Sequence, residues 1–124
     1  MILEPTKVIE LFMTSPNIQT FKAGETIFEI NETGDVMYGV IEGEVELWVA
    51  GAVFETIQPG DVFGEGALVQ IPHTRASTAK AKTDCRLAVL DKAHFLFLAQ
   101  ETPLFAVEVI RSLSTRLRSA KAAY

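Results

Sequence analysis

The chain has 124 residues, of which 48% are apolar and 22% are charged, so it is long enough and apolar enough to bury the core of one domain. No apolar run approaches the ~20 residues of a membrane-spanning helix, and the N-terminus lacks the basic region and cleavage site of a secretory signal. The single cysteine, Cys85, excludes an internal disulfide and favours a reducing compartment. With two histidines, the chain also has too few ligands for the usual zinc site. We therefore expect a cytoplasmic protein without a membrane segment or a metal cofactor.

Charge is distributed unevenly along the chain. Residues 1–65 contain 12 acidic and 2 basic residues, whereas residues 66–124 contain 4 acidic and 9 basic residues. A net charge of −5 makes the whole chain a poor non-specific binder of nucleic acid, because phosphate backbones require a basic surface. The basic second half can still bind a small anion.

In chain order, the first predicted element is a helix over residues 4–13, which contain four large apolar residues and a proline suited to a first turn. All eight glycines follow between Gly24 and Gly66, where they provide the conformational freedom of tight turns. Short apolar runs lie between these turns and predict a barrel or a jelly-roll-like sandwich of short strands. The runs are Glu25–Ile30, Val36–Ile41, Glu44–Val49 and Ala52–Ile57.

Residues 76–90 alternate between apolar and charged side chains, which predicts one long bent strand or two strands in series. A short apolar helix is expected over 92–99, and Thr102-Pro103 is typical of the start of a longer one. The longer helix has apolar residues at alternating steps of four and three, which fit either packing against the β unit or a homodimer seam. This stripe consists of Ala106, Ile110, Leu113, Leu117 and Ala120. We expect one domain over 1–124, with β structure over about 18–90 and C-terminal helices over about 91–121.

The segment 58–78 has the features of an anion site. Small residues at 64, 66 and 67 permit close approach of a ligand to the backbone, and one helical turn over Glu65–Gln70 would present free amides. Arg75 begins the next strand, from which its guanidinium can return to bind a phosphate with two parallel hydrogen bonds. Glu65, an acceptor when ionised, suits ligand hydroxyl groups. In the empty state we expect Glu65 to be a partial partner of Arg75.

The run Phe63-Gly64-Glu65, then Ala67-Leu68, followed by Arg75-Ala76-Ser77, resembles the phosphate-binding cassette of cyclic nucleotide-binding domains. Such domains occur in the catabolite activator family and in protein kinase A regulatory subunits. Residues 21–28, Gly34-Asp35 and residues 41–47 resemble other motifs of the family, so the similarity spans about residues 5–120. The resemblance implies a mainly β fold with flanking helices. Its parts are a double-stranded β-helix, also called a jelly-roll-like β-roll, an N-terminal helix, a short cassette helix and two C-terminal helices.

The resemblance also implies roles for individual residues. Glu65 would accept the ribose 2′-hydroxyl, Arg75 would bind the cyclic phosphate, and the amides of Gly66, Ala67 and Ala76 would contact phosphate and ribose. The last helix would close over the base or form a dimer seam through residues 102–121. Because eucaryotic members that favour cGMP have Ser or Thr directly after the arginine, Ala76 favours cAMP. The predicted ligand-binding residues are Gly64, Glu65, Gly66, Ala67, Leu68, Arg75, Ala76 and Ser77.

The chain departs from the family pattern at several positions. Gly66 stands where a bulky residue is usual, Thr74 stands where proline often precedes the arginine, and Ala120-Lys121 replaces the hydroxyl residues that bacterial members use to contact adenine. In the family's transcription factors a DNA-reading domain follows the last helix. Because this sequence ends at Tyr124, we expect no direct contact with DNA.

The function predicted from these residues is a non-enzymatic regulatory module that binds a cyclic nucleotide and relays its presence to an unknown downstream protein or to a dimer mate. A metal-dependent cupin enzyme fits poorly, because His73 and His94 lack the required spacing. Trp48 is expected at a surface and Cys85 in the core. The remaining alternative is a degenerate, ligand-free β-roll that serves protein–protein contact.

Overall fold

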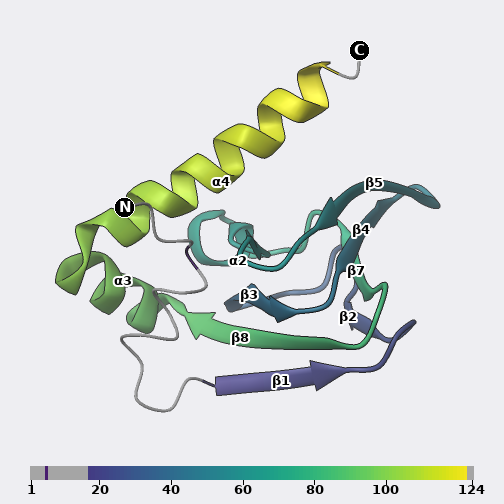
Figure 1. The fold of residues 1–124 in the computed structure, drawn as a ribbon, viewed down its shortest axis with the longest axis horizontal. Helices are drawn as coiled ribbons and strands as arrows, with labels where there is room; N and C mark the ends of the chain where they lie inside the picture. The colour runs from purple at the N-terminus through teal and green to yellow at the C-terminus, as the bar shows by residue number, and fades with distance from the viewer. Residues whose placement is uncertain (1–4, 6–16, 123–124) are drawn as a thin grey trace.

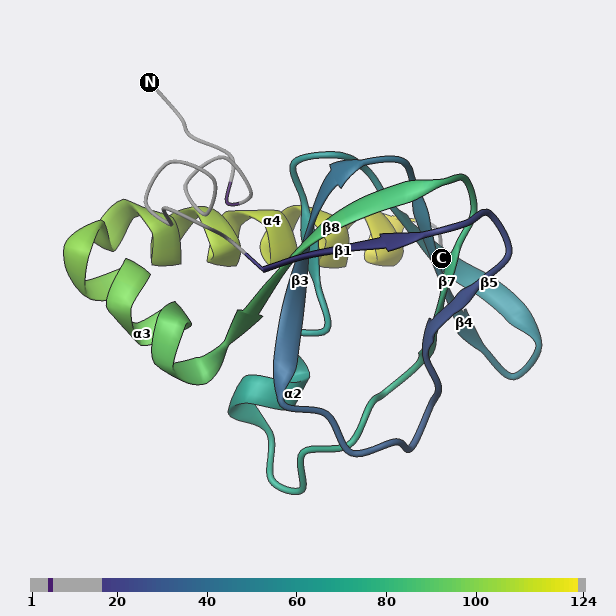
Figure 2. The ribbon, with the colours of Figure 1, turned by 90° about the horizontal axis from the view of Figure 1, so that it is seen from below.

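The computed structural model describes Pro5 and residues 17–122, so the helix expected over 4–13 lies almost wholly outside the described residues. The described chain forms two four-stranded antiparallel sheets that face each other, followed by two helices (Figures 1 and 2). The first sheet has the order β1 (Asn17–Phe21), β8 (Cys85–Asp91), β3 (Val36–Glu42), β6 (Val62–Phe63). The second has the order β2 (Thr26–Phe28), β7 (Thr78–Ala81), β4 (Val45–Val49), β5 (Ala52–Ile57). The predicted jelly-roll-like β-roll is confirmed.

The sheets form because their strands alternate apolar and polar side chains. Residues 76–90 make two strands in series, β7 and β8, joined by a turn over 82–84. Ala79, Ala81, Cys85, Leu87 and Val89 all point into the core between the sheets, as the alternation predicts. The short strands β1 and β6 were not expected as separate elements.

Strand β8 is buried on both faces. Leu87 and Val89 face the interior of the β-roll, whereas Ala88 and Leu90 face a second apolar cluster that includes residues of the C-terminal helices. This strand therefore joins the β-roll to the helices, because each of its faces is covered by a different core.

The two C-terminal helices, α3 (Lys92–Glu101) and α4 (Pro103–Ala122), meet at a bend of 115°. Pro103 begins α4, as the sequence predicts. The first half of α4 is anchored by Phe105 and Val109, which pack with Leu98 of α3 and with Met37 of β3. The helix then rises obliquely past α2 (Figure 1) and, seen from below, passes behind the strands of the β-roll (Figure 2).

The apolar stripe of α4 divides between two environments. Leu113 packs partly against the second cluster, whereas Ile110 is 64% exposed and Leu117 is 57% exposed. Leu104 and Val107 are exposed as well. Packing against the β unit therefore accounts for only part of the stripe.

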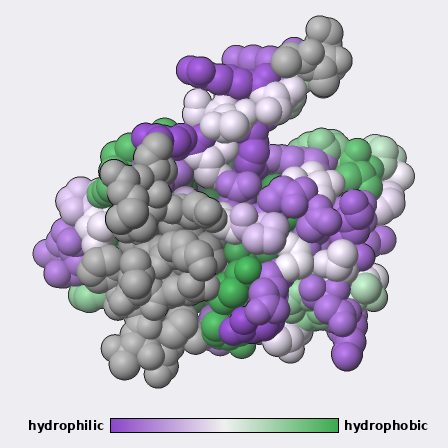
Figure 3. All heavy atoms as spheres, viewed as in Figure 1, coloured by the Kyte–Doolittle hydropathy of each residue, from purple (hydrophilic) through white to green (hydrophobic). Residues whose placement is uncertain are grey.

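The outer surface is mixed in character, with hydrophilic residues over the far end of α4 and apolar residues around the β4–β5 hairpin (Figure 3). No single helix in the described part of the chain has the length and hydropathy to span a bilayer. The bent pair α3–α4 does meet these two criteria when the helices are taken together.

Asp91 ends β8 and caps α3. Its Oδ1 accepts hydrogen bonds from the His94 amide at 2.9 Å and from His94 Nδ1 at 2.7 Å. These bonds, the backbone bond first, lower the pKa of Asp91. Because the folded-state pKa is depressed, the contribution of Asp91 to stability is present at neutral pH and is lost as pH falls through the folded pKa.

We therefore expect Asp91→Ala to lower the free energy of unfolding by about 1 kcal/mol at pH 7. Denaturant titrations should show this difference shrinking as pH falls below about 4, the ordinary pKa of aspartate, and disappearing once pH falls through the lower folded-state pKa. Asp91→Asn, which keeps a capping group, is the control and should retain most of the stability at pH 7. A loss in Asp91→Ala that is independent of pH would contradict the assignment to the ionised cap.

Candidate functional site

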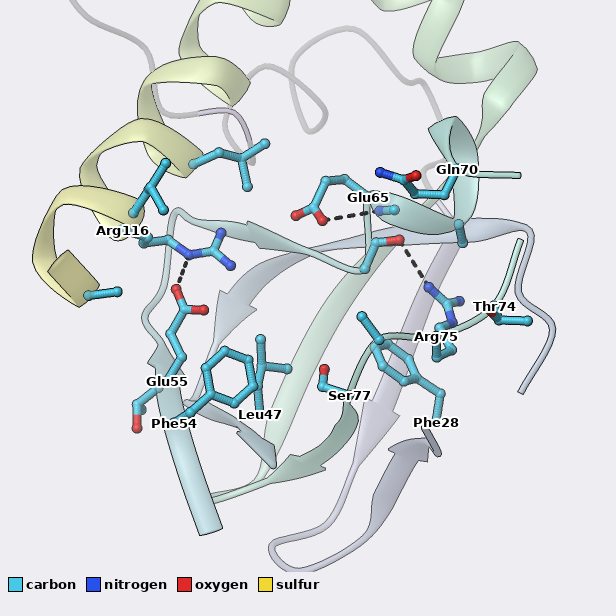
Figure 4. Close-up of a pocket in the computed structure, with 18 of the residues that line it drawn as sticks. Phe28, Leu47, Phe54, Glu55, Glu65, Gln70, Thr74, Arg75, Ser77 and Arg116 are labelled. Atoms are coloured by element: carbon cyan, nitrogen blue, oxygen red, sulfur yellow. Dashed lines mark hydrogen bonds and ion pairs between the residues drawn. The ribbon is translucent and has the colours of Figure 1, made fainter. Parts of the chain in front are cut away.

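A cavity of about 650 Å³ lies between the β-roll, the short helix α2 (Gly66–Val69) and the C-terminal half of α4. Figure 4 shows its lining. The structure brings seven of the eight predicted ligand-binding residues to this cavity: Gly64, Glu65, Gly66, Ala67, Arg75, Ala76 and Ser77. Leu68 is the exception. It lies on the opposite side of the α2 turn and packs into the second apolar cluster, where it is 4% exposed.

Helix α2 is shorter than the expected turn over Glu65–Gln70, because Glu65 caps its start and Gln70 caps its end. The Glu65 side chain accepts a hydrogen bond from the Gly66 amide at 3.1 Å. The Ala67 amide donates to the Gly64 carbonyl at 3.3 Å. Two of the three amides that the resemblance assigns to a ligand, those of Gly66 and Ala67, therefore have partners within the chain.

Arg75 is the central charged group of the cavity. It is only 6% exposed, and its Nη1 donates to the Gly64 carbonyl at 3.0 Å (Figure 4). Its Cζ lies 4.1 Å from the centre of the Phe28 ring, which packs at a tilt against the rings of Tyr38 and Phe63 in the core. Nε of Arg75 is buried and has no hydrogen-bond partner. A buried guanidinium whose N–H donors are only partly used can bind an anion, which accepts the remaining hydrogen bonds.

Two glycines leave room for this guanidinium. A Cβ at position 34 would lie 2.5 Å from Cζ of Arg75 and 2.7 Å from its Nη2. A Cβ at position 64, where φ is +76°, would lie 2.9 Å from Nη1. The motif glycines Gly34 and Gly64 thus provide the space that Arg75 occupies.

Glu65, the partial partner of Arg75 expected in the empty state, forms no hydrogen bond or ion pair with it among the described residues. Glu65 hydrogen-bonds to the Gly66 amide and Arg75 to the Gly64 carbonyl, because the α2 turn holds each side chain against the nearest backbone group. The two interact through charge only. Burial lowers the pKa of Arg75, whereas the negative charges of Asp35, Glu32 and Glu65 raise it.

The opposite end of the cavity is made of residues that the sequence analysis missed. Arg116 of α4 forms an ion pair with Glu55 of β5 and donates from Nη1 to the Val62 carbonyl at 2.5 Å (Figure 4). The sequence could have indicated a role for Arg116, because a cation within the apolar stripe, between Leu113 and Leu117, needs a partner of opposite charge. No pattern in the sequence indicated that Glu55 lines the cavity.

Phe54 lines the cavity because the pairing of β4 and β5 is irregular. Leu47 pairs with Glu55 and Trp48 pairs with Val53, so Phe54 is an extra residue in a β-bulge. A bulge re-aims side chains that regular alternation would turn to the other face. Trp48 is outside the cavity lining, on the outer side of the sheet near Lys80, as predicted.

The structure also gives the positions of His73 and Cys85, which the sequence analysis considered. His73 lies in the loop after α2, where its Nδ1 is 2.9 Å from the Ala67 carbonyl. Cys85 is 3% exposed, and burial raises the pKa of its thiol. Among the described residues, no group of three or more His, Cys, Asp and Glu is arranged to hold a metal ion.

Comparison with known proteins places the chain in a family. The model of the cyclic nucleotide-binding domain matches residues 18–102. A cyclic nucleotide-gated potassium channel from Mesorhizobium japonicum is 33% identical over 120 residues, which are 97% of this chain and 32% of the channel. The chain belongs to the cyclic nucleotide-binding domain family.

Solved structures agree with this assignment. The catabolite activator protein of Thermus thermophilus is 27% identical with a TM-score of 0.75, over 94% of this chain and 57% of that one. A protein described under a cyclic-GMP-dependent signalling pathway in bacterial phytopathogenesis is 25% identical with a TM-score of 0.75, over 96% and 98% of the two chains. This chain spans only about a third of the channel and 57% of the cAMP-activated regulator CRP from Pasteurella multocida.

The glycine at position 34 provides a direct test of the guanidinium position. Gly34→Ala should displace Arg75 while leaving the fold intact, because the colliding atoms are the far end of a flexible side chain. We expect a fall of at least tenfold in affinity for a cyclic nucleotide, measured by calorimetry. Thr33→Ala, at the exposed neighbouring position, is the control and should bind as the wild type does. Equal affinity in Gly34→Ala would show that the position of Arg75 does not matter.

Proposed function

We propose that this chain is a non-enzymatic regulatory module of the cytoplasm that binds a cyclic nucleotide, with cAMP favoured over cGMP, and relays its presence through α3 and α4. The observation that carries the proposal is the buried, incompletely partnered guanidinium of Arg75 at one end of a 650 Å³ cavity. Family membership supports the ligand class.

The phosphate would bind at Arg75. A charge-assisted hydrogen bond contributes about 1.5–3 kcal/mol, and the aromatic floor beneath the guanidinium limits competition by water. The amides of Gly66 and Ala67 are already paired, so a phosphate must compete for them with Glu65 and with the Gly64 carbonyl. If the ribose hydroxyl takes over the Glu65 carboxylate, the Gly66 amide becomes available to the phosphate at the same time.

The base would lie at the far end, between the β4–β5 hairpin and α4. Phe54 provides an aromatic face there, and stacking of a base on an aromatic side chain contributes about 1–3 kcal/mol. The Glu55–Arg116 pair offers an acceptor and donors for the polar edge of a purine. These contacts suit any purine, so the proposed preference for cAMP rests on Ala76, which has no hydroxyl group to offer guanine.

The relay would use α4. Its first turns are held by the apolar contacts of Phe105 and Val109, but from Ser112 onward polar groups also attach it. Ser112 donates to Asp61 at 2.9 Å, and Arg116 pairs with Glu55 at the cavity wall. Polar attachments can exchange with ligand contacts at little cost, so occupancy of the cavity would change how firmly this half of α4 is held.

Binding is tested by thermal unfolding with cAMP and cGMP. A ligand at 100 times its dissociation constant adds about 2.7 kcal/mol, which for a domain of this size is a shift of about 10 °C. We expect this shift with cAMP, a smaller one with cGMP at equal concentration, and none in Arg75→Ala. Arg75→Lys should also lose most of the shift, because an ammonium group lacks the planar fork.

The control for this experiment is Lys82→Ala, which removes an exposed cation from the β-roll and should respond as the wild type does. No shift of the wild-type protein with either nucleotide at millimolar concentration would rule out the sensing function. That result would favour a ligand-free β-roll used for protein–protein contact.

The exposed part of the α4 stripe supports a homodimer as one route of relay. Ile110→Glu would place a charge in the centre of the proposed seam, so we expect light scattering to show a dimer for the wild type and a monomer for the variant. Gln100→Glu introduces the same side chain at an exposed position of α3 and should leave the dimer intact. A monomeric wild-type protein would assign the relay to a different partner.

A further inference from the structure

Two acidic residues outside the cavity lining, Glu32 and Asp35, belong to a segment that is hydrogen-bonded to the backbone around Arg75. The segment that carries Glu32 and Asp35, here called the acidic rim, runs alongside the loop before β7 that carries Arg75. The Arg75 amide donates to the Glu32 carbonyl at 2.8 Å, and the Gly34 amide donates to the His73 carbonyl at 2.9 Å. Gly34, between the two rim residues, lies so close to the guanidinium that an added Cβ would be 2.5 Å from Cζ of Arg75. Both rim side chains belong to exposed residues.

The charge of the acidic rim acts on the buried groups of this end of the cavity. Burial is the largest influence on both groups, since it raises the pKa of Tyr38 and lowers that of Arg75. The charges of Asp35 and Glu32 act upward on both pKa values. The Arg75 guanidinium lies 5.8 Å from the Tyr38 ring, so both groups experience the same negative field. Arg116, the other cation of the lining, is already paired with Glu55 at the opposite end.

This end of the cavity therefore has one unpaired guanidinium facing a ligand and an excess of carboxylate charge around it. Arg75 can neutralise one negative charge. A phosphodiester carries one negative charge, whereas a phosphomonoester carries between one and a half and two at neutral pH. The additional charge of a monoester would have no cation to meet it and would lie in the field of the acidic rim.

We propose that Glu32 and Asp35 are specificity-determining residues that select phosphodiester monoanions over phosphomonoester dianions by charge. This inference rests on the proposed function, because it presumes that a nucleotide phosphate binds at Arg75. On this proposal the site disfavours 5′-AMP, the hydrolysis product of cAMP, for two reasons. The phosphate of 5′-AMP is not cyclic, and it carries more negative charge than the phosphate of cAMP.

The test separates charge from ring shape with three probes. cAMP is a cyclic diester, 5′-AMP is an open monoester, and the methyl ester of 5′-AMP is an open diester that differs from 5′-AMP by one charge. Dissociation constants are measured by calorimetry at pH 7.5 and low salt. We expect the methyl ester to bind at least threefold more tightly than 5′-AMP although it is larger, and the difference to narrow in high salt.

The variants Glu32→Gln, Asp35→Asn and the double variant should strengthen the binding of 5′-AMP more than that of cAMP or the methyl ester. We expect the ratio of the 5′-AMP and methyl ester dissociation constants to fall by about three- to tenfold in the double variant. Glu101→Gln removes the same charge at the exposed end of α3 and should leave this ratio unchanged.

The outcomes are distinguishable from failure of the function itself. If cAMP does not bind to the wild-type protein, the proposed function fails. If cAMP binds but 5′-AMP and its methyl ester bind equally well, selection is by shape and the charge proposal is wrong. The proposal is equally overturned if the double variant changes all three dissociation constants by the same factor.

Discussion

The structure depends on the burial of one guanidinium. Arg75 lies in the opening of an aromatic β-roll, where it has a ring beneath it, a glycine on either side and a single carbonyl as hydrogen-bond partner. Removing such a group from water is costly unless its donors are used or a counter-charge is close. The surrounding carboxylates favour the charged form of the guanidinium, but none of those described forms an ion pair with it. The cavity is therefore suited to bind an anion.

The sequence predicted those features that arise from local patterns. Alternation identified the inward face of β7 and β8, and the cassette residues around Glu65 and Arg75 come together where the motif indicates. Leu68 was misplaced because a four-residue helix exposes only one side to a cavity. Glu65 and Arg75, expected as partial partners, act on each other through charge alone, because nearby backbone groups compete for both side chains. Such competition is decided by geometry that residue type does not encode.

Long-range pairs were beyond the reach of sequence patterns. Arg116 and Glu55 are 61 residues apart, and their meeting depends on the direction in which α4 leaves the bend after α3. That direction is fixed by Phe105 and Val109 in the second cluster, hence by packing against β8. The start of the helix is thus held by buried apolar contacts, whereas the part near the cavity is held by charged and hydroxyl groups. The two parts of the helix are therefore attached to the β-roll by interactions of different kinds.

The bulge in β5 shows that strand length, as much as residue identity, decides which side chains line the cavity. Deleting one residue from the β4–β5 hairpin would restore regular pairing and turn Phe54 toward the face that carries Trp48. The same amino acids would then present a different wall to the base. Homologous hairpins are therefore better compared by counting residues from the turn than by matching similar side chains.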